Sequence, residues 1–172
     1  MKELENLVWT REQYNIHWRG YNSPRRVFEY EQKILSLLPR DKEIKIVDIG
    51  CGIGRLMNQI WHKGYKNIEG IDISDVAITV LNKRYPYLKG KVADATKIDF
   101  SSYDLAIVTE VIEHLEDDLC LKLPKNWIAS VPNGDTIAKS HVRSYLPEDI
   151  KSRFNAEVFF AGKWIIFGNL EK

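Results

Sequence analysis

Residues 46–54 read I-V-D-I-G-C-G-I-G, an apolar run that ends in three glycines at every second position. The run over residues 44–49 is short, β-branched and flanked by charged residues and glycine, which is typical of a strand buried on both faces of a parallel sheet. The glycines let the chain turn sharply and lie close to a ligand. A helix is predicted over residues 55–63, so free backbone N–H groups should face that ligand. A tight turn without a ligand is the alternative.

The glycine spacing bears on the nature of the ligand. Dinucleotide folds use G-x-G-x-x-G, whereas this chain has the tighter pattern D-x-G-x-G-x-G, with an acid two positions before the first glycine. An acid there disfavours a pyrophosphate and suits a cationic ligand. The string V-D-I-G-C-G-I-G-R-L resembles motif I of the class I S-adenosylmethionine (SAM) methyltransferases. This resemblance implies that Asp48, Gly50, Gly52 and Gly54 hold the methionine end of SAM. Ile49 and Cys51, in the same stretch, are further cofactor-binding candidates.

Composition indicates a soluble globular protein. The 172 residues are 44% hydrophobic and 28% charged, with a formal net charge of +1, so we expect one domain over residues 1–172 and little electrostatic attraction to nucleic acid. No apolar run is long enough to span a bilayer. The two cysteines, Cys51 and Cys120, do not form a disulfide framework, so a cytoplasmic location is expected.

Strand-like and helix-like stretches alternate along the chain. Strands are predicted over residues 44–49, 67–73, 91–93, 103–109, 127–131, 157–160 and 163–167. Helices are predicted over residues 24–38, 55–63, 74–84, 111–121 and 147–154. This order predicts an α/β fold with three layers and a doubly wound, mostly parallel sheet that ends in an antiparallel hairpin. The resemblance implies seven strands, a core over residues 41–172 and an N-terminal helical lid over residues 1–40.

Acidic residues also end the second and third predicted strands. Asp72 is placed to accept hydrogen bonds from two ribose hydroxyls, and the resemblance implies that Ile73 packs on the adenine. Asp94 and Ala95 resemble the residues that contact the adenine amino group. The alternatives are that Asp72 caps the next helix beside Ser74 and that Asp94 is an ordinary strand-end acid.

The stretch 103–115, Y-D-L-A-I-V-T-E-V-I-E-H-L, resembles motif IV of small-molecule methyltransferases, including those of ubiquinone biosynthesis. The resemblance places Glu110 at the methyl-transfer point. The N-P-P-Y and Pro-Cys signatures of DNA base methylation do not occur here, so a DNA base is disfavoured.

The same stretch contains E-x-x-E-H, formed by Glu110, Glu113 and His114. On a helix these side chains would share a face. The pattern resembles metal sites of some ubiquinone-pathway and small-RNA 3′-end methyltransferases. His141 is a candidate for a further ligand. The pattern also occurs in relatives without a metal, where Glu113 and His114 only cap or line the site, so no metal ligand is assigned from sequence.

Two histidines are candidate general bases. His114 ends motif IV, and His141 lies in S-H-V-R-S-Y, which with S-V-P-N at residues 130–133 resembles small SAM-dependent methyltransferases. A base near neutral pKa suits a hydroxyl or a protonated amine. The alternative is that each histidine is structural and bonded to loop backbone.

Two further features concern the acceptor. The N-terminal aromatic segment offers Tyr14, Trp18 and Arg19 as lid residues, or alternatively as anchors for the following helix. The connection over residues 115–126 is short, and no insertion follows the fifth strand. Few residues are therefore left to enclose an acceptor. We expect the acceptor to be either a bulky molecule, such as a protein or an RNA end, or a small molecule whose site is completed by a second copy of the chain or another subunit.

The sequence thus predicts an enzyme that moves a methyl group from SAM to an oxygen or nitrogen nucleophile and releases S-adenosylhomocysteine. The alternatives are a non-catalytic SAM-binding partner subunit and, less favoured by the glycine spacing, an NAD(P)-dependent oxidoreductase.

Overall fold

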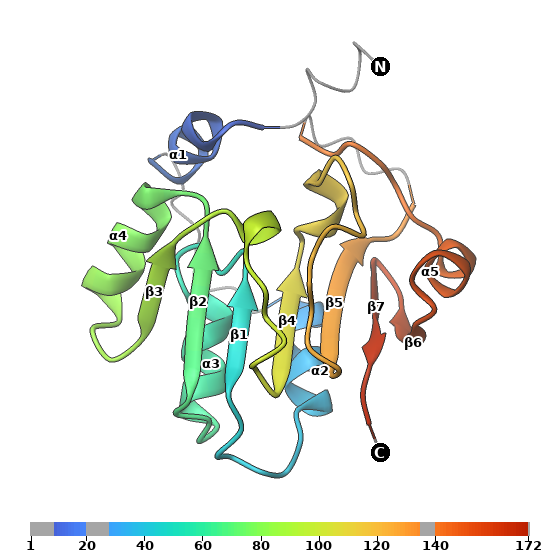
Figure 1. Ribbon diagram of the computed structural model, residues 1–172, viewed down its shortest axis with the longest axis horizontal. Coiled ribbons are helices and arrows are strands. Elements are labelled where there is room, and N and C mark those ends of the chain that lie inside the picture. Colours follow the sequence, from blue (N-terminus) through green and yellow to red (C-terminus); the bar gives the residue numbers. More distant parts are fainter. Residues whose placement is uncertain (1–8, 20–27, 135–139, 172) are drawn as a thin grey trace.

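The computed structural model describes residues 9–19, 28–134 and 140–171. Seven strands form one sheet in the order β3-β2-β1-β4-β5-β7-β6 (Figure 1). The strands are β1 (Ile46–Ile49), β2 (Ile68–Asp72), β3 (Lys89–Val92), β4 (Leu105–Thr109), β5 (Trp127–Pro132), β6 (Glu157–Ala161) and β7 (Trp164–Asn169). The first five pair in parallel, and β7 pairs antiparallel with both β5 and β6. The predicted α/β sheet with its terminal hairpin is confirmed.

Strand β1 lies in the middle of this sheet, between β2 and β4. All four of its residues are buried. Ile46 packs in the core on one face, and Val47 and Ile49 pack in the core on the other. Side chains alternate across a strand, so a strand covered on both faces needs apolar residues at successive positions. In β1 only Asp48 departs from this pattern.

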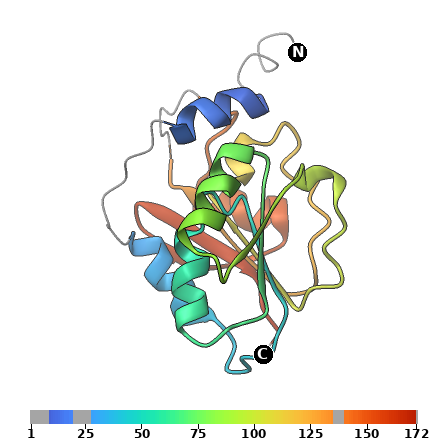
Figure 2. The same cartoon turned by 90° about the vertical axis from the view of Figure 1, so that its left-hand side faces the viewer.

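Three helices cover one face of the sheet (Figure 2). They are α2 (Glu29–Leu37), α3 (Arg55–His62) and α4 (Asp75–Arg84). Each contributes apolar side chains to a common core, for example Ile34, Met57 and Leu81. The N-terminal part of the predicted helix 24–38, residues 24–27, lies outside the described residues.

The opposite face is covered by helix α5 (Pro147–Phe154) and by irregular segments. The prediction of a helix over residues 111–121 is wrong. A single 3₁₀ turn, η2 (Ile112–His114), forms instead, and the chain continues without regular structure to β5. The physical reason is tertiary, because the buried carboxylate of Asp118 pairs with Arg143 and Arg153 from later segments of the chain.

Helix α1 (Arg11–Arg19) lies beyond the carboxyl ends of the parallel strands (Figure 1). Its buried Asn15 joins it to the start of α4. The side-chain oxygen of Asn15 accepts a hydrogen bond from Ser74 Oγ at 2.6 Å, and its amide donates to Asp75 at 2.7 Å. Because Ser74 also caps α4 by accepting from the backbone N–H of Ala77, α1 is anchored on a well-defined helix terminus.

Candidate functional site

The glycine turn follows β1 and fits tightly against its neighbours. Gly50, Gly52 and Gly54 all have positive φ angles, of 72°, 52° and 78°, which non-glycine residues adopt only with strain. A Cβ on Gly52 would lie 2.6 Å from the indole of Trp18 in α1. The turn therefore requires glycine both for its backbone conformation and for the close approach of α1.

Two buried acids lie beside this turn. Asp48 is 1% exposed, and its Oδ1 accepts no hydrogen bond from any described residue. Burial, with a smaller contribution from the charge of Asp72, raises the pKa of Asp48 to about 8. Asp72 accepts hydrogen bonds from the N–H groups of Gly52 and Ser74, both at 2.8 Å. Burial raises the pKa of Asp72 although these two bonds oppose the shift.

A cavity of about 650 Å³ opens beyond the ends of β2, β3 and β4, within the usual range for small-molecule sites. Many of the cofactor-binding and catalytic candidates predicted from the sequence line this cavity. They are Ile49, Gly50, Asp72, Ile73, Asp94, Ala95, Glu110 and His114. Asp94 also caps a short 3₁₀ turn, η1 (Ala95–Lys97), by accepting from the backbone and hydroxyl of Thr96.

A second hollow of about 270 Å³ adjoins the first and shares Gly50, Glu110 and His114 with it. Its lining includes Asp48, Cys51 and Gly52 together with aromatic residues of the N-terminal segment. Gly54 lines neither hollow. Its hypothetical Cβ would lie 2.8 Å from Leu81, so Gly54 serves the packing of α3 against α4.

Glu110 stands where the two hollows meet. It has a positive φ of 55°, a strained conformation for a non-glycine residue. Its carboxylate accepts hydrogen bonds from Ser130 Oγ at 2.9 Å and from Trp164 Nε1 at 3.1 Å. Burial raises the pKa of Glu110 to about 7. Trp164 was missed from sequence, since a tryptophan in a hairpin strand gives no signal of this contact.

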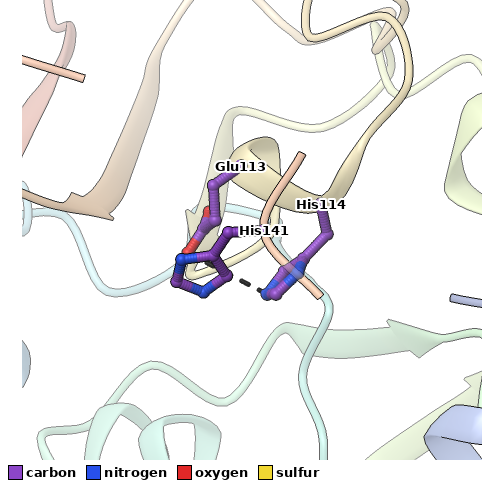
Figure 3. Close-up of side chains that lie close together, drawn as sticks. All are labelled: Glu113, His114 and His141. Atoms are coloured by element: carbon purple, nitrogen blue, oxygen red, sulfur yellow. Dashed lines mark ion pairs between the residues drawn. The ribbon is translucent and has the colours of Figure 1, made fainter. Parts of the chain in front are cut away.

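Glu113, His114 and His141 converge beside these hollows (Figure 3). One possible ligand atom from each lies within 4.8 Å of the others. The Glu113 carboxylate is 1% exposed and accepts no hydrogen bond from the described residues. The Nε2 atom of His114 lies 4.0 Å from Glu113 Oε1. The three residues therefore form a compact set of oxygen and nitrogen donors.

Hydrogen bonding sets the tautomer of His114. Its Nδ1 lies 2.8 Å from the backbone oxygen of Ser140, and because a carbonyl only accepts, Nδ1 carries the proton. Nε2 then keeps its lone pair whenever the ring is neutral. Burial lowers the pKa of His114 to about 4, so the ring is neutral near pH 7.

In the structure, the group that lies together is not Glu110, Glu113 and His114, as the E-x-x-E-H pattern suggested, but Glu113, His114 and His141. The helix that was to align Glu110 with Glu113 and His114 does not form, and the Glu110 carboxylate is bonded to Ser130 and Trp164. His141 takes its place, with its ring 4.8 Å from that of His114. His141 lines neither hollow, whereas His114 lines both.

Two of the three predicted lid residues reach the site. Tyr14 and Trp18 line both hollows, and the Tyr14 ring lies edge-on to His114 at 6.1 Å. Burial, together with Asp72 and Glu113, raises the pKa of the Tyr14 hydroxyl. Arg19 instead forms an exposed ion pair with Glu12 at 3.1 Å within α1 and lines neither hollow.

Within the described ranges, no helix combines the length and apolar character needed to cross a membrane.

Known proteins resemble this chain in both sequence and fold. The family model described as "Methyltransferase domain" matches residues 46–133. The mitochondrial ubiquinone biosynthesis O-methyltransferase of Saccharomyces cerevisiae is 30% identical over 95 residues, 51% of this chain and 30% of that protein. Indole glucosinolate O-methyltransferase 1 of Arabidopsis thaliana is 26% identical over 79% of this chain and 36% of that protein. The chain thus spans about a third of the length of these curated relatives.

Solved structures share the fold. Magnesium protoporphyrin IX methyltransferase from Synechocystis PCC 6803 with bound SAH superposes with a TM-score of 0.69 at 15% identity, covering 93% of this chain and 98% of that one. The methyltransferase domain of a bacterial Hen1 protein gives a TM-score of 0.66 at 19% identity, covering 83% and 98%. The family model, the strand order and the glycine turn agree, and the chain belongs to the class I SAM-dependent methyltransferase family.

Proposed function

We propose that this protein transfers the methyl group of SAM to a hydroxyl oxygen of its acceptor and releases S-adenosylhomocysteine. One observation carries the proposal. The cavity beyond the carboxyl ends of β2, β3 and β4 runs from the acids predicted to bind the nucleoside to Glu110 and His114. Ligands in open α/β sheets bind at this edge. Two of the similar proteins reported above are also O-methyltransferases by name.

The two hollows suggest how SAM would lie. Its adenosine would occupy the larger hollow, with the ribose hydroxyls on Asp72 and the adenine against Ile73, Asp94 and Ala95. Its methionine end would occupy the smaller hollow, beside Asp48 and the glycine turn. Glu110 and His114 line both hollows, so the sulfonium methyl would lie next to them.

His114 is suited to accept the proton that the acceptor hydroxyl loses. During transfer the bond between sulfur and the methyl carbon breaks as the bond between carbon and oxygen forms, and the attacking oxygen becomes strongly acidic. A weak base is then sufficient. The neutral Nε2 of His114 offers one, held in its tautomer by Ser140. Alignment in a site partly shielded from water by Tyr14 and Trp18 would supply much of the remaining acceleration.

The cluster of Glu113, His114 and His141 fits a divalent cation. A carboxylate that is buried without a hydrogen-bond donor is costly, and the Glu113 carboxylate is in this state beside two imidazoles. Carboxylate and imidazole are common ligands of divalent metals. We propose that these three residues hold such an ion. With the ion bound, Nε2 of His114 would be a metal ligand and not the base, and the ion would take over the base's part by polarising the acceptor hydroxyl so that its proton passes to solvent.

Binding is tested by calorimetry with SAM and NAD(H). We expect SAM to bind and Asp72→Asn to weaken SAM binding at least tenfold, because a neutral amide cannot accept from both ribose hydroxyls as the carboxylate does. Asp99→Asn is the matched control, since Asp99 is exposed and caps a turn outside the site. NAD(H) binding without SAM binding would refute the proposal.

Transfer is tested with tritiated SAM and the purified chain on cell-extract fractions treated with nuclease, with protease or left untreated. Label in a base-stable ether supports a hydroxyl acceptor, and the treatment that abolishes labelling identifies the acceptor class. SAM binding with no labelled product in any fraction would favour the non-catalytic partner-subunit alternative. Label on nitrogen would overturn the hydroxyl assignment alone.

A further inference from the structure

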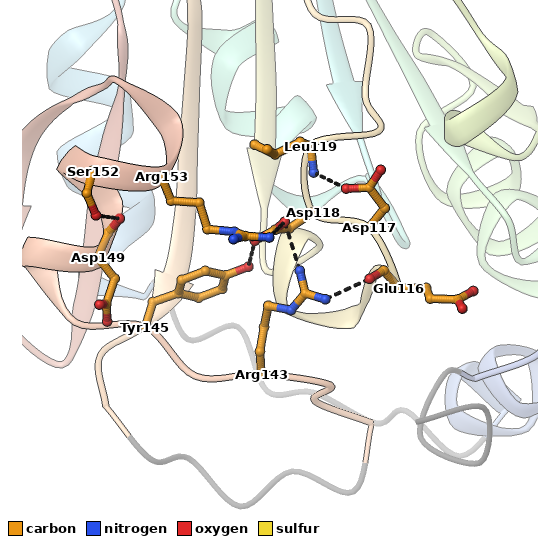
Figure 4. A network of polar contacts seen from close by, with 9 residues as sticks. All are labelled: Glu116, Asp117, Asp118, Leu119, Arg143, Tyr145, Asp149, Ser152 and Arg153. Carbon is orange, nitrogen blue, oxygen red and sulfur yellow. Dashed lines mark hydrogen bonds and ion pairs between the residues drawn. The ribbon is translucent and has the colours of Figure 1, made fainter. Parts of the chain in front are cut away.

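A buried acid outside both hollows links the segments that build the histidine cluster. Asp118 is 3% exposed and lies in the irregular connection between η2 and β5. Its carboxylate is paired with the guanidinium groups of Arg143, at 2.8 Å, and Arg153, and it accepts a hydrogen bond from the hydroxyl of Tyr145 at 2.7 Å (Figure 4). Asp118 is thus surrounded by donors from two other parts of the chain.

The partners of Asp118 belong to the segment that carries His141. Arg143 and Tyr145 lie two and four residues after His141, and Arg153 lies on α5. Arg143 also donates to the backbone oxygen of Glu116 at 2.6 Å. The segment 140–146, which has neither helical nor regular strand structure apart from one isolated bridge at Tyr145, is therefore held along residues 113–118 by side-chain contacts.

Two backbone contacts extend this attachment to the cluster itself. The N–H of Val142 donates to the backbone oxygen of Glu113 at 2.8 Å, and His114 Nδ1 donates to the backbone oxygen of Ser140. His141 lies between these two contacts in the chain, with its ring beside that of His114. Its position therefore depends on how the segment 140–146 is docked.

Charge compensation at Asp118 explains how the segment 140–146 is held in place. A buried carboxylate is tolerated only when opposite charges and donors compensate its desolvation. Burial alone would raise the pKa of Asp118, but the hydrogen bonds from Arg153, Tyr145 and Arg143 hold it at about 2. The carboxylate accepts hydrogen bonds from Tyr145 and Arg153 and forms an ion pair with Arg143, so replacing it would leave both guanidinium groups without their shared counter-charge.

We propose that Asp118 is a positioning residue for His141. It holds the segment 140–146 in the register that places His141 beside Glu113 and His114, although it lines neither hollow. Outer contacts of this kind typically change metal affinity or activity by roughly 10–100-fold when removed. The role of the positioned cluster in cation binding rests on the proposed function, whereas the geometric role of Asp118 does not.

The test is Asp118→Asn, which keeps the shape of the side chain and removes its charge. In the metal-free protein we expect loss of the nuclear Overhauser contact between the ring protons of His114 and His141. We also expect Mn²⁺ affinity to fall at least tenfold and SAM affinity to change less than about threefold. Glu148→Gln is the control, because it removes one negative charge from the exposed surface of the neighbouring helix α5.

A second variant keeps the test decisive if Asp118→Asn does not fold. Arg143→Met removes one link between the segment and Asp118 and leaves Arg153 and Tyr145 in place, and the same losses are expected in weaker form. The proposal is overturned if a folded variant of either kind keeps both the histidine contact and the wild-type Mn²⁺ affinity. If the wild type binds no Mn²⁺, the metal part of the proposed function fails, and the histidine contact alone decides the role of Asp118.

Discussion

The indole N–H of Trp164 donates a hydrogen bond to the carboxylate of Glu110 at 3.1 Å. Trp164 begins the antiparallel strand β7, and Glu110 directly follows the parallel strand β4. Since β5 lies between these strands, the contact crosses one whole strand at the rim of the sheet. The reversed hairpin therefore takes part in the site by orienting the acid where the two hollows meet.

The first prediction concerns this contact. Trp164→Phe removes the donor and keeps an aromatic ring against Phe28 and Tyr30. A hydrogen bond to a charged group contributes about 1.5–3 kcal/mol, so we expect methyl transfer to fall about 10–100-fold. Loss of the donor should also raise the pKa of Glu110 above its value of about 7 and move the pH profile upward. Trp61→Phe, a change on α3 away from the site, should leave both unchanged.

The second prediction separates crowding from backbone strain in the glycine turn. Gly52→Ala would place a Cβ 2.6 Å from Trp18 at a φ of 52°, whereas Gly134→Ala has a φ of 76° and its Cβ would meet no atom of the described residues within 4 Å. Both variants should lose roughly 1–2 kcal/mol of stability through strain. Gly52→Ala alone should weaken SAM binding, by at least tenfold in calorimetry. Equal SAM affinities in the two variants would contradict the proposed fit between the turn and α1.

The third prediction is a pH dependence set by Asp48. Its pKa rises from 3.8 to about 8 on folding, so the ligand-free folded state binds more protons than the unfolded state between these values. The contribution of Asp48 to the free energy of unfolding is therefore present below about pH 4 and is lost as the pH rises to about 8. Denaturant titrations should show that Asp48→Asn flattens this decline. A wild-type slope that persists in the variant would assign the effect to other groups.

The fourth prediction is a trade between stability and cation binding at Glu113. Glu113→Gln replaces a buried carboxylate that accepts no hydrogen bond from the described residues with a neutral group of the same size. We expect the metal-free variant to be at least as stable as the wild type, because the desolvation of a charge is removed, and to lose Mn²⁺ binding. Glu157→Gln, at an exposed position of β6, should change neither. Retained Mn²⁺ binding in Glu113→Gln would remove this residue from the metal site.

Much of the sheet was predictable because its strands are read from local patterns. The short apolar run before Gly50 predicted β1, and the Ser74-Asp75 pair predicted the start of α4 where the structure has it. Helix α5 matches its predicted range, residues 147–154. These signals depend on neighbours within a few positions, so one sequence contains them completely.

The helix expected over residues 111–121 failed for the opposite reason. Asp118 is compensated by Arg143 and Arg153, more than twenty positions away. Local helix preference differs among residues by less than about 1 kcal/mol each, so tertiary contacts readily override it. No pattern within residues 111–121 indicates the contacts that Asp118 makes with Arg143 and Arg153.

The sequence by itself determined the alternation of strands and helices along the chain, the glycine turn and the acids at the strand ends. These features depend on local patterns, and parallel strands bring their carboxyl ends to one edge of the sheet. Only the tertiary structure decided which side chains meet beyond that edge. It placed His141 instead of Glu110 beside Glu113 and His114, bonded Glu110 to Trp164, and laid α1 over Gly52. These contacts join irregular segments and opposite ends of the chain, where packing and charge compensation rather than local periodicity fix the geometry.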